Sequence, residues 1–153
     1  MLLRALRDVN VPKFLKDDLP LFENIIIDLF PTTKKPDVDR GVLLEAVKNV
    51  CKKRFLQSIP MFVEKVFQLY DTTVVRHGLM IVGPTGGGKT SCYKVLAAAQ
   101  SALNGVDDYH KTNYHVLNPK SITMDQLYGA LDPSSGEWND GIAARIIGNC
   151  SKD

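Results

Sequence analysis

A glycine-rich turn between two apolar runs constrains this sequence more than any other feature. The turn reads GPTGGGKT and occupies residues 83–90. It follows GLMIV at 78–82, an apolar run short enough for a strand buried on both faces of a parallel sheet. It overlaps the start of KTSCYKVLAAAQSAL at 89–103, which is rich in good helix formers. A strand, a glycine turn and a helix in this order predict the start of an α/β fold with a parallel sheet.

The turn fits the pattern GxxxxGK[ST], which is typical of loops that hold phosphate groups. Glycine permits the positive φ angles and the close backbone approach that wrapping a phosphate chain requires. The wrapped N–H groups and the N-terminus of the following helix both attract an anion. We therefore predict that ATP or ADP binds here, with the β-phosphate among the backbone amides of residues 86–90. The predicted binding residues are Gly83, Pro84, Thr85, Gly86, Gly87, Gly88, Lys89, Thr90 and Ser91.

Two side chains of the turn have predicted roles, but the sequence offers no catalytic partner for them. Lys89 would place a positive charge on the β- and γ-phosphates, and the Thr90 hydroxyl would bind Mg²⁺. Hydrolysis also needs an acidic residue after a second strand and a group that orients water. The next predicted strand, YHVLNP at 114–119, ends without an acid, and Asp132 follows a predicted helix. Arg145, the last arginine of the chain, is predicted to be an exposed helix residue, so no catalytic residue is predicted.

Apolar residues recur at helical spacing in the rest of the chain. Ahead of the turn, the predicted helices cover residues 2–9, 17–31, 40–57 and 61–77, and TTKKPDVD at 32–39 predicts a linker. The helix at 17–31 has Asp18 as its predicted N-cap and Pro20 in its first turn, and its predicted apolar faces are Leu21, Ile25 and Leu29 together with Phe22 and Ile26. After the turn, helices are predicted at 121–131 and 142–150.

Composition excludes several classes of function. The 153 residues are 44% hydrophobic and 24% charged, which suits one soluble domain or a piece of a larger one. A net charge of +2 gives no reason to expect binding to nucleic acid or to a membrane. The longest apolar run is far shorter than the roughly 20 residues that span a bilayer, and the N-terminus lacks the features of a signal peptide. Cys51, Cys92 and Cys150 have no CxxC spacing, which favours reduced cytosolic thiols over a zinc site or disulfides.

Several stretches, in order along nearly the whole chain, resemble the dynein heavy chain. They are LLRALRDVNVPKFLKDDLPLF, DLFP, RHGLMIVGPTGGGKT, LNPKSI and LYGALDPSSGEWNDG. They are similar to the junction of the first and second AAA+ modules of the motor ring, and GPTGGGKT and PLFENIIIDLFP look more axonemal than cytoplasmic. The resemblance implies that residues 1–35 end the small helical subdomain of the preceding module. It implies that residues 36–153 begin the large α/β subdomain of the second module, with its P-loop.

The resemblance also implies roles outside the turn. Arg4 and Arg7 lie in a segment similar to the one that carries the sensor-2 arginine, which would serve the nucleotide of the preceding module. LQSIP at 56–60 resembles the stretch that lines the adenine. In this family the second module binds ATP mainly in a structural or regulatory role for microtubule-based movement. The implied partners are neighbouring AAA+ modules and, through other regions, intermediate chains, light chains and microtubules. The implied location is the cytoplasm, the cytoskeleton and the ciliary axoneme, with no nucleic acid or membrane partner.

The chain departs from the family pattern in one respect, because it ends before the Walker B strand of the second module. In AAA+ modules the strands that lie between the P-loop strand and the next strand in sequence come later in the chain. We therefore expect residues 78–82 and 114–118 to lack their partners, and the chain alone to be no competent ATPase. Two other readings stay open. One is a self-contained, kinase-like P-loop enzyme, and the other is a structural fragment that binds no nucleotide.

Overall fold

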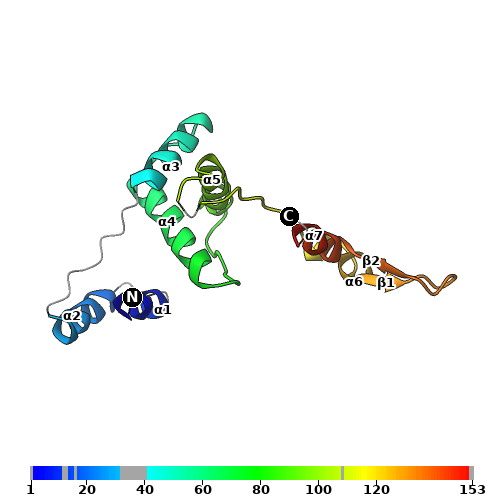
Figure 1. Cartoon of the computed structure of the whole chain (residues 1–153), viewed down its shortest axis with the longest axis horizontal. Coiled ribbons are helices and arrows are strands. Elements are labelled where there is room, and N and C mark those ends of the chain that lie inside the picture. Colours follow the sequence, from blue (N-terminus) through cyan, green and yellow to red (C-terminus); the bar gives the residue numbers. More distant parts are fainter. Residues whose placement is uncertain (1, 12–13, 16, 32–40, 108, 152–153) are drawn as a thin grey trace. The chain divides into compact units, whose positions relative to one another are not determined.

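The computed structural model describes residues 2–11, 14–15, 17–31, 41–107 and 109–151, and the chain divides into two compact units. The first unit, residues 1–112, is helical (Figure 1). Its helices are α1 (Leu2–Asn10), α2 (Leu19–Leu29), α3 (Gly41–Lys53), α4 (Pro60–Val75) and α5 (Lys89–Ala102). The second unit, residues 113–153, contains the 3₁₀ turn η2 (Pro119–Ser121), α6 (Met124–Tyr128), β1 (Gly129–Leu131), β2 (Trp138–Asp140) and α7 (Ile142–Cys150). Every predicted helical segment contains a helix, although α6 is much shorter than its predicted segment.

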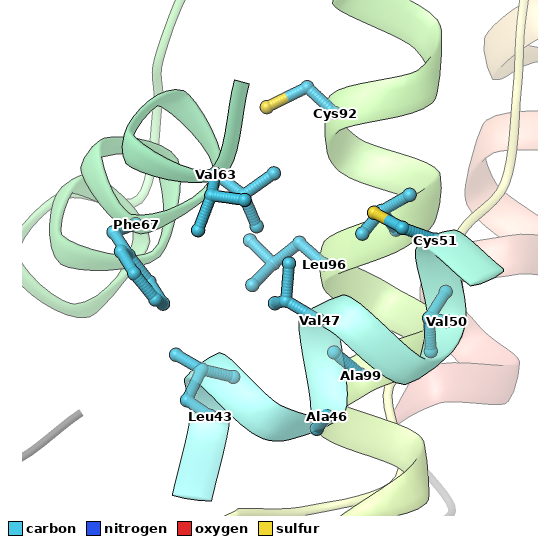
Figure 2. Packing of buried hydrophobic residues seen from close by; sticks show 12 residues of the cluster. Leu43, Ala46, Val47, Val50, Cys51, Val63, Phe67, Cys92, Leu96 and Ala99 are labelled. Atoms are coloured by element: carbon cyan, nitrogen blue, oxygen red, sulfur yellow. The ribbon is translucent and has the colours of Figure 1, made fainter. Parts of the chain in front are cut away.

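The buried core of the first unit lies where α3, α4 and α5 meet. Figure 2 shows side chains from these three helices pointing toward one another. Their buried positions recur three and four residues apart, which places them on one face of each helix. The core residues are Leu43, Ala46, Val47, Val50 and Cys51 from α3, Val63, Val66 and Phe67 from α4, and Cys92, Val95, Leu96 and Ala99 from α5. This core holds the start of α5, and with it the end of the glycine turn, against α3 and α4.

Helices α1 and α2 are joined by polar and aromatic contacts. The Arg7 Nη2 atom donates a hydrogen bond to Glu23 Oε1 at 3.0 Å, and the rings of Phe14 and Phe22 lie 5.0 Å apart. Arg7, one of the two arginines in the sensor-2-like segment, therefore pairs with a carboxylate of α2. The side chain of the other, Arg4, lies outside the described residues.

The prediction for the buried face of α2 was partly wrong. Ile26 is buried, but Leu21, Ile25 and Leu29 are exposed, Leu21 by 63%. Asp18 occupies the N-cap position without a side-chain capping bond, and Pro20 lies in the first turn as predicted. Periodicity identified the helix, but it does not reveal which apolar stripe finds a neighbour to pack against.

The predicted parallel sheet does not appear among the described residues. Residues 78–82 belong to no helix or strand, and Met80 and Val82 are 86% and 82% exposed. Residues 114–118 likewise belong to no strand. The only described sheet is the antiparallel pair β1–β2, in which Gly129 faces Asp140 and Leu131 faces Trp138. A strand exists only where neighbouring strands take up its N–H and C=O groups, so two separated strand sequences do not form a parallel sheet by themselves.

The second unit is built around the β1–β2 hairpin. Thr123 caps α6 through a capping box with Gln126. The peptide after α6 turns at Gly129, where φ is 122° and an added Cβ would lie 2.5 Å from the Asn139 carbonyl oxygen. A side chain at Gly129 would therefore clash with β2, which explains why glycine ends the helix and starts the strand.

Helix α3 ends in a Schellman motif that has phenylalanine where glycine is usual. The Leu56 N–H donates to the Cys51 carbonyl at 2.9 Å, and the Phe55 N–H donates to the Lys52 carbonyl at 3.2 Å. This pattern puts Phe55 in the left-handed region with φ of 55°. Leu56 packs against the core, which anchors the turn, whereas the Phe55 side chain is exposed.

Replacing Phe55 with glycine should stabilise the first unit by about 1 kcal/mol, because glycine removes the Cβ strain of the left-handed region. The measurement is the free energy of unfolding in urea. Phe55→Ala is the matched control. It removes the ring but keeps the Cβ and the strain, so the unfolding free energy should change by less than about 0.5 kcal/mol. Equal stabilisation by both variants would contradict the strain argument.

The cysteines agree with the prediction of free thiols. Cys51 and Cys92 are buried and unpaired in the core, and Cys150 is exposed and unpaired. Burial raises the pKa of the Cys51 and Cys92 thiols, which keeps them protonated and favours a packing role. Over the described part of the chain, no helix is long and apolar enough to cross a bilayer.

Candidate phosphate-binding site

The candidate site is the turn at residues 83–90, which leads directly into α5. Gly86 and Gly88 have φ angles of 81° and 79°, in the left-handed region that glycine adopts at little cost. The Gly87 N–H donates to the Pro84 carbonyl at 3.1 Å and closes a tight turn. A Cβ added at Gly87 would lie 3.1 Å from that same oxygen. Three consecutive glycines are thus explained by two positive φ angles and one close contact.

Lys89 reaches back across the turn. Its Nζ atom donates hydrogen bonds to the Gly83 carbonyl at 2.7 Å and to the Pro84 carbonyl at 2.6 Å. An ammonium group has three N–H donors, so one donor remains for a ligand. The two carbonyls therefore hold the positive charge beside the turn. Sequence reasoning predicted the charge but not these partners, which are backbone atoms that no sequence pattern reports.

The N-terminus of α5 supplies the backbone donors of the site. Its first intrahelical bond runs from the Cys92 N–H to the Gly88 carbonyl at 2.8 Å, and no side chain caps the helix. The N–H groups of Lys89, Thr90 and Ser91 precede that bond, so they have no intrahelical acceptor. Together with the positive end of the helix dipole, these N–H groups form an environment that favours an anion.

Phe62 is a neighbour of the turn that sequence reasoning missed. A Cβ added at Gly88 would lie 3.7 Å from its ring, so the first turn of α4 packs beside the phosphate loop. Phe62 comes two residues after the segment 56–60, which resembles the adenine-lining stretch of the family. Phe62 is a partly buried residue that packs against the core. An apolar residue at this position of α4 indicates packing, but it does not identify the glycine turn as the neighbour.

Thr90 is the metal ligand that the sequence predicts, and it lies at the end of the glycine turn. The Thr90 side chain is exposed in the first turn of α5, where its hydroxyl would be available to a cation beside bound phosphates. No group of three or more His, Cys, Asp or Glu residues with metal-binding geometry occurs in the described part of the chain. Asn118 caps η2 by accepting from the Lys120 N–H, and Arg145 is exposed on α7 as predicted.

Asp132 follows the strand β1, so the prediction that it follows a helix was wrong. Its Oδ1 atom accepts hydrogen bonds from the Ser134 N–H at 2.8 Å, the Ser134 hydroxyl and the Ser135 N–H at 3.2 Å. The backbone of this loop is closed further by the Gly136 N–H, which donates to the Asp132 carbonyl at 2.9 Å. Asp132 therefore organises the hairpin loop.

The bonds from Ser134 and then Ser135 lower the pKa of Asp132. A carboxyl with a lowered pKa stabilises the fold above its unfolded value of about 3.9, and that contribution disappears as pH falls through the lower, folded pKa. We expect the hairpin loop to lose its order only below about pH 4. An NMR titration of the Asp132 carboxyl carbon checks this. Ser134→Ala should move the midpoint back toward the ordinary value, and an unchanged midpoint in that variant would contradict the assigned cause.

Comparison with known proteins gives a consistent result over most of the chain. The family described as "Hydrolytic ATP binding site of dynein motor region" matches residues 1–90. The human protein "Dynein axonemal heavy chain 1" is 56% identical over 150 residues, which are 95% of this chain and 4% of that protein. The mouse protein "Dynein axonemal heavy chain 3" is 51% identical over 149 residues, which are 96% of this chain and 4% of that protein. The chain thus spans about 4% of the length of these relatives.

Proposed function

Because the chain belongs to the dynein heavy-chain family, we propose that its glycine turn binds ATP or ADP within an axonemal motor heavy chain. The residues that would hold the nucleotide are Gly83, Pro84, Thr85, Gly86, Gly87, Gly88, Lys89, Thr90 and Ser91. Thr90 would hold Mg²⁺ through its hydroxyl. Bound nucleotide would act mainly as a structural or regulatory ligand for microtubule-based movement.

One observation carries this proposal, namely the coincidence of three features in a single turn. Two glycines adopt positive φ angles, the Lys89 ammonium is held beside the turn by two carbonyls, and the helix that follows opens with free N–H groups. Each feature favours negative charge, and together they fit a chain of phosphates. Packing of α5 on α3 and α4 fixes the helix end, which lowers the entropy lost when a ligand binds.

We also propose that residues 1–35 close the small helical subdomain of the preceding AAA+ module and that residues 36–153 begin the next one. The match to the hydrolytic-site family stops at residue 90, on the last residue of the turn, while similarity to the relatives covers 95% of the chain. If the phosphate loop belonged to the hydrolytic module, the match to that family would continue after the loop over the rest of the module's site. Because the match stops at the loop, we assign the loop to the next module. The buried cluster draws its residues from α3, α4 and α5, as a boundary before α3 would require, although α1 also contacts α4 within the same compact unit.

In this proposal the chain turns over no ATP by itself. Hydrolysis requires an acid after a second strand, yet the stretch at 114–118 is followed by no acid, and Asp132, which follows β1, accepts hydrogen bonds from Ser134 and Ser135 of its own hairpin loop. The proposed direct partners are the neighbouring AAA+ modules. Intermediate chains, light chains and microtubules would be reached through other regions of a heavy chain that works in the ciliary axoneme.

Isothermal titration of the chain with ATP, with and without Mg²⁺, tests the proposal, and amide NMR locates the site. We expect binding that strengthens with Mg²⁺, amide shifts concentrated at residues 86–91, and no phosphate release. No binding at all would refute the proposal and favour the alternative of a structural fragment that binds no nucleotide. Shifts centred outside the turn would refute the residue assignment, and transfer of phosphate to an acceptor would support the kinase-like alternative.

A further inference from the structure

We propose that the C-terminal end of α3 is a docking surface for an acidic protein segment that carries an apolar side chain. The surface consists of Lys52, Lys53, Arg54 and Phe55, and we call it the α3-end surface. It is separate from the phosphate turn, and it does not depend on nucleotide binding. Three of its features have no explanation in the packing of the first unit.

The first feature is Phe55 itself. Its side chain is 97% exposed, so it gains almost nothing from the core. Its backbone has a φ of 55°, which glycine would adopt with less strain. A large apolar side chain that is both strained and solvated lowers the stability of the isolated unit. Residues of this kind are characteristic of binding sites, where a partner covers the ring and offsets the cost.

The second feature is a set of unmatched positive charges. Lys52, Lys53 and Arg54 are all exposed, and within the described residues no carboxylate forms an ion pair with any of them. They complement the negative end of the α3 dipole, which explains one or two cations but not an exposed aromatic ring beside them. Three adjacent cations around an apolar residue match a partner with carboxylates around an apolar side chain.

The third feature is the shape next to these charges. The surface there is an open, shallow depression lined by Asn49, Lys52 and Lys53 on the last turns of α3. Its rim offers the Asn49 amide, a donor and acceptor, together with two ammonium groups. A carboxylate-bearing chain that crosses this depression would receive charge-assisted hydrogen bonds while Phe55 reaches an apolar neighbour.

A protein segment fits this surface better than a nucleic acid does. Single-stranded nucleic acids are held by extended basic grooves with several aromatic side chains, and nucleic-acid-binding domains are typically strongly basic. Here the cations are confined to three adjacent residues, one aromatic ring accompanies them, and the whole chain has a net charge of only +2. The compact patch matches a short acidic segment.

The test measures binding of a fluorescein-labelled polyglutamate peptide with interspersed leucines by fluorescence anisotropy. We expect Phe55→Gly to weaken binding at least about tenfold, because it removes the anchoring ring. This variant should be at least as stable as the parent chain, so lost binding would not reflect unfolding. The double variant Lys52→Glu with Lys53→Glu should also weaken binding about tenfold or more, and added salt should weaken binding to the parent chain.

The matched control is Lys111→Glu with Lys120→Glu, which changes the net charge equally at two exposed lysines elsewhere. It should change the affinity less than about twofold, because those charges lie outside the surface. The proposal is wrong if the parent chain does not bind the peptide, if Phe55→Gly binds as well as the parent, or if the control variant loses as much affinity. Tighter binding of single-stranded oligothymidine than of the acidic peptide would reassign the surface to nucleic acid.

Discussion

Lys89→Ala should weaken the binding of Mg-ATP by about 10- to 150-fold, the range expected when a hydrogen bond to a charged group is lost. The Lys89 ammonium is held beside the turn by the carbonyls of Gly83 and Pro84, so the substitution removes both the positive charge and these two hydrogen bonds. Isothermal titration measures the change. Circular dichroism should show an unchanged helical signal, since Lys89 is not part of the buried core.

Lys94→Ala is the matched control for this prediction. Lys94 lies five residues further along α5 and carries the same charge. Loss of the Lys94 charge should change the affinity for Mg-ATP less than about threefold, because the influence of a charge on the phosphates falls with distance and is screened by salt. Equal losses in the two variants would show that general positive charge, and not the position of Lys89, governs binding. No loss in Lys89→Ala would refute the phosphate role of the turn.

The second large effect is expected at Leu43, whose side chain is 0% exposed in the α3–α4–α5 cluster. Leu43→Ala should lower the free energy of unfolding by about 2–5 kcal/mol, because it removes buried methyl groups and leaves a cavity. A whole domain is commonly stable by only about 5–15 kcal/mol, so this one substitution should bring the unit close to unfolding. Urea denaturation followed by circular dichroism measures the change.

Leu21→Ala makes the same chemical change on α2, where the leucine is 63% exposed. The unfolding free energy should change by less than about 0.5 kcal/mol, because little apolar surface is uncovered. Comparable losses in the two variants would contradict the assignment of the core to α3, α4 and α5. Loss of nucleotide binding in Leu43→Ala would be an indirect effect, since the core fixes the start of α5.

The geometry of the glycine turn was predictable because the information that sets it is local. The glycines of the turn, Lys89 and the start of α5 are consecutive in sequence, and their backbone geometry depends on residues within a few positions. The two positive φ angles lie at glycines of the predicted motif. The contact between Phe62 and Gly88 was not predictable, because it joins residues far apart in the chain.

The strands were less predictable than the helices for the same reason. The run at 78–82 has the composition of a buried strand, yet it is unpaired and its side chains are exposed. The hairpin β1–β2 formed within a stretch that was expected to be part helix and part loop. In both cases the outcome depended on whether another segment offers its backbone groups, which composition does not report.

By itself, the sequence determined where the helices form and where the glycine turn lies, because a helix bonds its own backbone four residues away and a glycine sets its own φ. Only the tertiary structure decided which apolar faces are buried, which extended runs find a partner, and which atoms hold Lys89. Those features depend on contacts between distant residues. Leu21 and Leu43 therefore have the same side chain and opposite environments. Phe55 is exposed although its large apolar side chain would suit a core.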